Sequence, residues 1–268
     1  MHGYDGMRPA EKTGRLIILF LLLVPVIVFS AGTTSHAQGF DVQPVKVFFN
    51  GRTRAEKLVV TNVGGGDLSL QVQAFAWAQD KDGEDVYGET SDIVIFPRIL
   101  MIPRGEQRII RLGAAPGPSS REGTYRVYLE ELPIRARKKS GAGAGVRLTL
   151  RVGIPVFVSP VNNPDKKASG SLTMEKGKAV VRARNDGNTH LIIQSITITG
   201  RDARGAEVFS KDFKGWYLLG GASRTHVTDI LPATCRRLSE IHAVVRTTKN
   251  SIEETLPVTK DMCAPQAE

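Results

Sequence analysis

The sequence predicts an all-β fold built from two sandwich domains. Short segments with apolar residues at every second position are separated by turns rich in Gly, Asn and Asp, which is typical of β-strands. No segment after residue 37 has the 3.6-residue period of an amphipathic helix, so we expect almost no helix. The stretch Ser159–Ala168 has the composition of a linker, with about seven strands expected on either side. Each half therefore has the size of an immunoglobulin-like sandwich.

The expected strands follow one another closely along both halves. Val42–Phe49 is expected to be one strand, and a polar hairpin is expected at Asp80–Gly88. In the second half, the turn Asn185–Asn188 separates two apolar segments. Each half contains one tryptophan, Trp77 or Trp216, which we expect in the core of its sandwich.

The charge is spread evenly over these two halves. The chain of 268 residues carries a formal net charge of +9, and 41% of its residues are hydrophobic, which is ordinary for a folded protein. Residues 38–160 hold 17 basic and 13 acidic residues, and residues 161–268 hold 16 and 12. The densest basic run is Arg135, Arg137, Lys138 and Lys139, and no aromatic residue is interleaved with it. We therefore expect a basic loop and no binding of nucleic acid.

The N-terminus has the pattern of a secretory signal peptide. Arg8, Lys12 and Arg15 precede the apolar run Leu16–Phe29, and small residues end at Ala37. The alternative is a membrane anchor, but the run is shorter than the roughly 18–20 residues that span a bilayer. We expect residues 1–37 to be removed and the remaining chain to be exported, without a membrane-embedded segment.

Export bears on the redox state expected for the two cysteines. Cys235 and Cys263 are 28 residues apart, and in an oxidising compartment such a pair is expected to form a disulfide. The alternative is a buried pair of free thiols.

No pattern of catalytic or metal-binding residues is present in the sequence. The three histidines after residue 37, which are His190, His226 and His242, lack the spacing of metal ligands. No nucleophile–base motif is found either. We expect neither an enzyme nor a bound cofactor or metal.

The most unusual segment is a long alternating run at the end of the first half. Aliphatic residues occupy every second position from Val146 to Val158 and share one face of an extended chain. Such a strand either belongs to the core of its own domain or pairs with another chain through an open edge. Pro155 lacks a backbone N–H group, which favours an edge position.

These features resemble the PapD/FimC-like periplasmic chaperones of the chaperone–usher pilus pathway. The resemblance spans the chain after the signal peptide and rests on the order of several motifs rather than on one. In the first half these are P-V-K-V-F-F-N-G (44–51), V-V-T-N (59–62), A-F-A-W (74–77), I-P-R-G-E-Q-R-I-I-R-L (102–112), Y-R-V-Y-L-E-E-L-P (125–133) and V-F-V-S-P (156–160). The second half matches more loosely, at V-V-R-A-R-N-D-G-N (180–188) and W-Y-L-L-G-G (216–221).

The resemblance implies a domain layout and a mode of action. It implies two immunoglobulin-like domains in an L-shaped arrangement, at residues 38–160 and 161–268, in a periplasmic protein. It also implies that the chaperone binds and caps pilus subunits by donor-strand complementation and delivers them to an outer-membrane usher. The subunit-binding residues implied on the donor strand are Val146, Leu148, Leu150, Val152 and Ile154.

The family also holds the C-terminal carboxylate of the subunit with two basic residues. The first position is Lys46 in this chain, whereas the second is Pro155 and carries no charge. Arg111 and Glu131 match the first-domain members of a charge network between the family's domains. A secreted fibre subunit or adhesin of two sandwiches is the alternative function.

Overall fold

The computed structural model describes residues 39–117, 119–133 and 148–263. The expected signal peptide, the basic run at residues 135–139 and Val146 lie outside the described residues. The described chain is almost entirely β, with one short helix, α2 (Pro232–Cys235), and one 3-10 turn, η1 (Lys260–Cys263). In this part of the chain, no helix has the length and apolar character needed to cross a membrane. The all-β prediction is confirmed.

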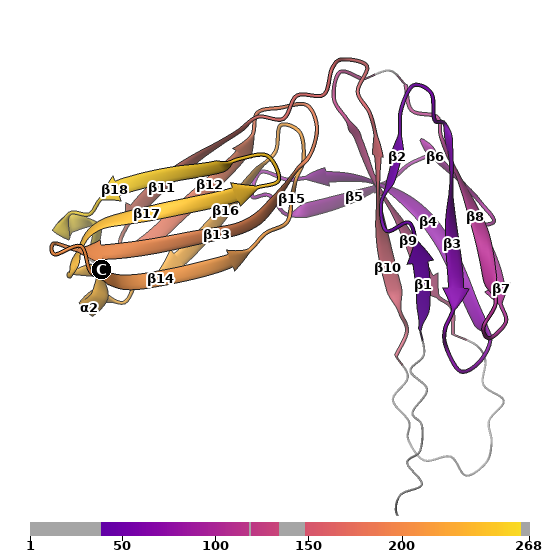
Figure 1. Cartoon of the computed structure of the whole chain (residues 1–268), viewed down its shortest axis with the longest axis horizontal. Helices are drawn as coiled ribbons and strands as arrows, with labels where there is room; N and C mark the ends of the chain where they lie inside the picture. The colour runs from indigo at the N-terminus through magenta and orange to yellow at the C-terminus, as the bar shows by residue number, and fades with distance from the viewer. Residues whose placement is uncertain (1–38, 118, 134–147, 264–268) are drawn as a thin grey trace, which may run out of the picture. The chain divides into compact units, whose positions relative to one another are not determined.

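Two sheets form the first sandwich (Figure 1). One has the order β1-β3-β8-β6, and the other has the order β2-β10-β9-β4-β5, with β7 paired to β4. The strand bounds are β1 (Phe40–Gln43), β2 (Val47–Phe49), β3 (Ala55–Asn62), β4 (Leu68–Gln79), β5 (Asp85–Glu89), β6 (Ile93–Phe96), β7 (Ile99–Ile102), β8 (Gln107–Ala114), β9 (Gly123–Glu131) and β10 (Arg151–Val158).

Alternation of apolar residues explains how these two sheets hold together. Leu58 and Val60 on β3 face Leu70 and Val72 on β4 across one core, and all four are fully buried. The residues between them point away from the core, because successive side chains of a strand lie on opposite faces. Burying each such aliphatic side chain contributes about 1.5–3 kcal/mol to stability.

The prediction of one strand over Val42–Phe49 is wrong. The segment contains the end of β1 and the whole of β2, and these lie in different sheets. Pro44 lies between them after a cis peptide bond, and it has no N–H group to continue a ladder. As a result β1 pairs with β3, whereas β2 pairs in parallel with the last three residues of β10.

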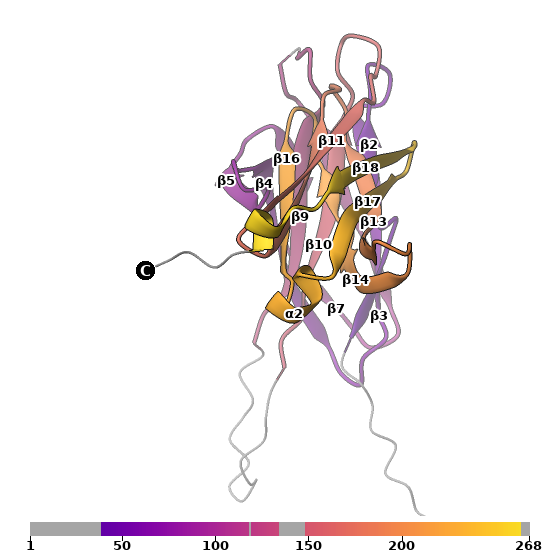
Figure 2. The same ribbon diagram turned by 90° about the vertical axis from the view of Figure 1, so that its left-hand side faces the viewer.

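The second sandwich also has two sheets around one core, and Figure 2 draws the chain from another side. Their orders are β11-β12-β16 and β14-β13-β17-β18, with β15 paired to β13. The strand bounds are β11 (Ala168–Glu175), β12 (Lys178–Asn185), β13 (Leu191–Asp202), β14 (Glu207–Lys214), β15 (Tyr217–Leu218), β16 (Ser223–Asp229), β17 (Leu238–Thr247) and β18 (Ser251–Pro257).

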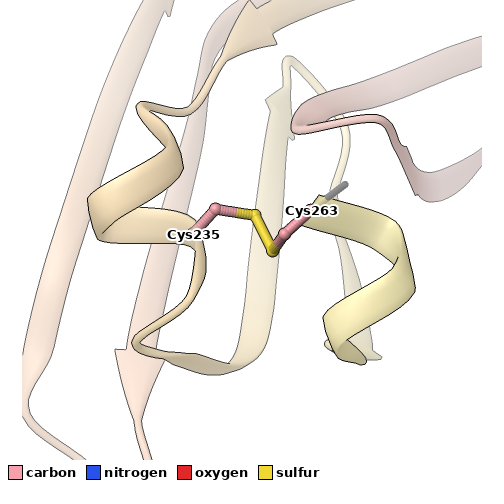
Figure 3. The surroundings of a disulfide bond; sticks show 2 residues. All are labelled: Cys235 and Cys263. Carbon is pink, nitrogen blue, oxygen red and sulfur yellow. A yellow bond between two sulfur atoms is a disulfide. The ribbon is translucent and has the colours of Figure 1, made fainter. Parts of the chain in front are cut away.

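A disulfide joins Cys235 of α2 to Cys263 of η1 (Figure 3). Both cysteines are buried and belong to the core of the second sandwich. The bond therefore fastens the end of the described chain to a segment 28 residues earlier.

The prediction that each tryptophan lies in the core of its own sandwich is wrong. Trp77 is buried, but it packs with Phe157 and Leu219 in a separate small cluster. Trp216 is 42% exposed, and its indole N–H donates a hydrogen bond to Asp85. Both rings therefore lie where residues of the first sandwich meet residues 216–219.

Candidate partner-binding edge on strand β10

Strand β10 has a neighbouring strand on only one side along most of its length. It pairs with β9 over all of Arg151–Val158, but with β2 only over Val156–Val158. Within the described residues, Arg151–Pro155 thus has no strand beside its other edge. An edge of this kind leaves backbone N–H and C=O groups available to another chain.

The alternating apolar residues divide into two groups at this edge. Leu148 is 76% exposed and Leu150 is 37% exposed, whereas Ile154 is 3% exposed and belongs to the core of the first sandwich. Val152 is half-buried and packs against that core. The exposed apolar surface of this segment therefore belongs to the residues before β10.

The strand itself is shorter than the alternating sequence suggests. It begins at Arg151, and residues 148–150 are not in a strand. The chain still runs beside β9 at Leu150, because the backbone N–H of Glu131 donates to the Leu150 carbonyl over 2.9 Å. An extended segment held on one side only is suited to β-strand addition, in which a second chain pairs with the open edge.

Lys46, the expected carboxylate anchor, lies in the turn between β1 and β2. It is half-buried, and its Nζ atom is 5.6 Å from the centre of the Tyr217 ring. Among the described residues it has no ion pair. Pro155 is buried on β10 and provides no charge at the second position.

Arg111 and Glu131 do not form an ion pair with each other. Arg111 is exposed on β8, whereas Glu131 is buried at the end of β9, close to the Leu150 backbone. A contact that the sequence did not indicate links Glu122, before β9, to His190, before β13. The Nδ1 atom of His190 is 2.7 Å from the Glu122 carboxylate, and the backbone N–H of His190 donates to the same oxygen over 2.8 Å.

Gln79 on β4 makes a second long-range contact that the sequence did not indicate, to residues 217 and 219. Its amide nitrogen donates to the Tyr217 carbonyl over 2.8 Å, and its amide oxygen accepts a bond from the Leu219 N–H over 3.0 Å. The bonded residues are about 140 positions apart in the sequence, so no local motif reveals the contact. In the described part of the chain, no three His, Cys, Asp or Glu side chains are grouped to hold a metal.

Comparison with known families identifies the first sandwich. Residues 39–164 match the family model of the pili and flagellar-assembly chaperone, PapD N-terminal domain. The first sandwich of this chain is therefore a domain of the PapD N-terminal type, the type found in pilus-assembly chaperones. The family favours a chaperone over the alternative of a fibre subunit, and its fold is that of non-enzymatic chaperones.

Solved structures of PapD-like chaperones share the fold of this chain. One is the CsuC–CsuE chaperone–tip adhesion subunit pre-assembly complex from the archaic chaperone–usher Csu pili of Acinetobacter baumannii. That match has 20% identity and a TM-score of 0.56, and it covers 81% of this chain and 97% of the other. Another is the Salmonella enterica SafA pilin in complex with the SafB chaperone, with 13% identity and a TM-score of 0.52, covering 83% and 99%. No curated protein matches this chain.

Proposed function

We propose that the chain is an exported periplasmic chaperone that binds pilus subunits by lending them the open edge of β10. It then caps them and delivers them to an outer-membrane usher. The observation that carries the proposal is the exposure of Leu148 and Leu150 beside the one-sided backbone of Arg151–Pro155. Apolar side chains and a one-sided backbone are the two things that an incomplete sandwich needs from a donor strand.

The partner contact is assigned to the residues that remain accessible. Leu148 and Leu150 are the main apolar donors, and Val146 precedes them in the same alternation. Val152 contributes through its exposed part, whereas Ile154 packs into the chaperone's own core. Lys46 is proposed to meet the C-terminal carboxylate of the subunit.

Complexes of related folds support this type of partner. The Csu structure contains a chaperone with a tip subunit, and the Saf structure contains a chaperone with a pilin. We propose cleavage of a signal peptide after Ala37, followed by two domains at residues 38–160 and 161–268.

Co-expression with a pilus subunit that lacks its own donor segment tests the proposal. The wild-type chaperone should co-purify with the subunit and protect it from protease. Replacing Leu148 and Leu150 with Asp should abolish both effects, because two charges cannot be buried in the subunit's apolar groove. Leu231→Asp is the matched control, since Leu231 is 75% exposed and lies outside the first sandwich.

Two results of this experiment would contradict the proposal. Binding that survives the double Asp substitution would overturn the donor role of these residues. Failure of the wild type to protect any strand-deficient subunit would contradict the chaperone function itself.

A further inference from the structure

The turn between β4 and β5 lies directly against strand β16. A Cβ atom added to Gly83 would be 2.6 Å from the Ser223 carbonyl oxygen and 2.7 Å from the Cα atom of Arg224. Distances this short leave no room for a side chain at this point of the turn. Gly83 also has a φ of 87°, which glycine adopts without strain. The turn therefore packs backbone against backbone on β16.

Arg224 binds this turn through its guanidinium group. Its Nη1 atom donates to the Gly83 carbonyl over 3.0 Å, and its Nη2 atom is 3.4 Å from the Glu84 carboxylate. The side chain of Arg224 is 18% exposed, whereas that of Glu84 is 72% exposed. The bond to the Gly83 carbonyl is thus the stronger part of the contact, because ion pairs with exposed carboxylates contribute little. We refer to residues 80–84 and Arg224 as the latch.

His226 lies on the same face of β16 as Arg224. Side chains two residues apart on a strand point to one face and are separated by about 7 Å along it. The Nε2 atom of His226 is buried and has no hydrogen-bond partner among the described residues. Such an atom gains hydration when it becomes accessible to water, and the gain is largest when the ring is charged.

Charged groups near His226 come from its own strand, from the turn and from β14. Arg224 precedes it on β16, and Glu84 belongs to the turn. The Phe213 ring of β14 is 5.1 Å from the His226 ring, and the Nζ atom of Lys211 is 5.9 Å from the centre of the Phe213 ring. Two of these three charges are positive, so a positive charge on His226 would be repelled more than attracted.

The environment of His226 accordingly favours its neutral form. Strand β12 places the uncharged Val181 opposite it. Burial, followed by the charge of Arg224, lowers the pKa of His226, and Glu84 opposes this shift. A proton on the ring is therefore unfavourable while the latch is closed.

We propose that the latch is acid-sensitive: protonation of His226 places a second positive charge beside Arg224, and the turn then lifts off β16 so that both cations reach water. The latch holds at neutral pH and opens as the pH falls below about 6.5. Gln79 and Asp85 bond separately to residues 216–219, so the opening is confined to the turn and Arg224. This inference does not depend on the proposed function.

A nuclear Overhauser effect (NOE) between the Hα protons of Gly83 and Arg224 measures closure of the latch. We expect this NOE at pH 7.5, and we expect it to weaken about fivefold by pH 5 as the open form becomes dominant. The loss should follow the titration of the His226 ring signal. The NOE between Gly170 and Ile252, which are in contact within the second sandwich, is the control and should stay constant.

Two results of this titration would overturn the proposal. One is a Gly83–Arg224 NOE that persists after the His226 ring has been protonated. The other is a His226 ring that stays neutral down to pH 5, because the latch would then not respond to mild acid.

The variant His226→Gln separates His226 from other groups that respond to acid. Glutamine is polar but carries no charge at any of these pH values, so the Gly83–Arg224 NOE should remain at pH 5. His190, which faces Glu122, is unchanged in this variant. If the NOE disappears in His226→Gln as it does in the wild type, the acid response belongs to another group and the proposal is overturned.

A second turn, at residues 202–206, provides a matched control for the latch. In both turns an aspartate Oδ1 atom accepts the N–H groups two and four residues later. The glycines at the fourth position, Gly83 and Gly205, have φ values of 87° and 80°. A Cβ atom on Gly205 would meet nothing within 4 Å. Gly205→Ala therefore has the backbone cost alone, whereas Gly83→Ala adds a collision with β16.

These two alanine variants test the coupling in the reverse direction. If the proton opens the latch, forcing the latch open must favour the proton, because coupling is reciprocal. Gly83→Ala should thus raise the pKa of His226 towards its ordinary value of 6.5, and Gly205→Ala should leave the wild-type value unchanged. NMR titration of the ring measures both. Equal titration curves in the two variants, or a lower pKa in Gly83→Ala, would overturn the proposal.

Discussion

Leu150 and Ile154 lie on one line of alternating aliphatic residues, but the first is 37% exposed and the second is 3% exposed. The change occurs where β10 begins, at Arg151. From Ile154 onwards the line fills the core of the first sandwich, whereas the side chains of Leu148 and Leu150 are exposed. One alternating hydrophobic pattern thus begins with exposed residues and continues with core residues.

This division predicts very different effects of the same substitution. Leu150→Asp should change the free energy of unfolding by no more than about 0.5 kcal/mol, as is usual at exposed positions. Ile154→Asp should destabilise the chain by more than about 4 kcal/mol or prevent folding, because it buries an unpaired charge in the core. Urea unfolding followed by circular dichroism measures both values. Similar losses in the two variants would contradict the division.

The Glu122–His190 pair should contribute measurably to stability. Both side chains are largely buried, and Glu122 accepts the His190 backbone N–H as well as facing its ring. Glu122→Ala leaves the buried backbone N–H of His190 without its acceptor and should cost about 1–3 kcal/mol. Glu106→Ala, which breaks the exposed pair with Arg108, is the control and should cost at most about 1 kcal/mol. Thermal unfolding that does not distinguish the two variants would show that the buried pair adds nothing.

Loss of the Cys235–Cys263 disulfide should destabilise the second sandwich. The bond closes a loop with a sequence separation of 28, and such a cross-link stabilises by about 2–4 kcal/mol. The double variant Cys235→Ser, Cys263→Ser should therefore unfold at lower urea concentration than the oxidised wild type. The reduced wild type should behave like the variant. Equal midpoints for the oxidised and reduced wild type would contradict this expectation.

His226 should make the chain sensitive to mild acid. Burial, followed by the charge of Arg224, lowers the pKa of His226 from its ordinary value of 6.5, while Glu84 opposes the shift. The folded state thus favours the neutral ring, and the unfolded state binds the proton more readily. The resulting stability is present above the unfolded-state pKa and is lost as the pH falls below about 6.5 towards the folded-state pKa.

Replacing His226 with Leu should remove this contribution. We expect the difference in unfolding free energy between wild type and His226→Leu to shift in favour of the variant as the pH falls from 7.5 to about 5. A difference that is constant over this range would show that His226 does not titrate differently on folding. Urea unfolding at a series of pH values provides the measurement.

Local patterns in the sequence predicted the strands well because strand burial repeats every second residue. The alternation at Leu58 and Val60, or at Leu70 and Val72, is visible without any tertiary information. The break at Pro44 was missed, since a proline can begin or edge a strand as well as interrupt one. Hydropathy also does not show where one buried face ends, so Ile154 and Leu150 look alike in sequence.

Contacts between distant residues account for what the sequence did not reveal. Trp216 bonds to Asp85 across 131 positions, and His190 faces Glu122 across 68. Neither pair has a spacing motif, and both depend on how strands of different sheets are brought together. The same holds for Arg126, whose buried Nε and Nη2 atoms have no hydrogen-bond partner among the described residues.

Hydrogen exchange at the open edge is the most direct test of donor-strand binding. Backbone amides of residues 148–154 would be compared in the free chaperone and in its complex with a strand-deficient pilus subunit. We expect exchange to slow at least tenfold at alternate positions of this segment, because a second strand would accept those N–H groups. The edge strand β14 (Glu207–Lys214) should be unaffected. A complex in which residues 148–154 exchange as fast as in the free protein would contradict binding through this edge.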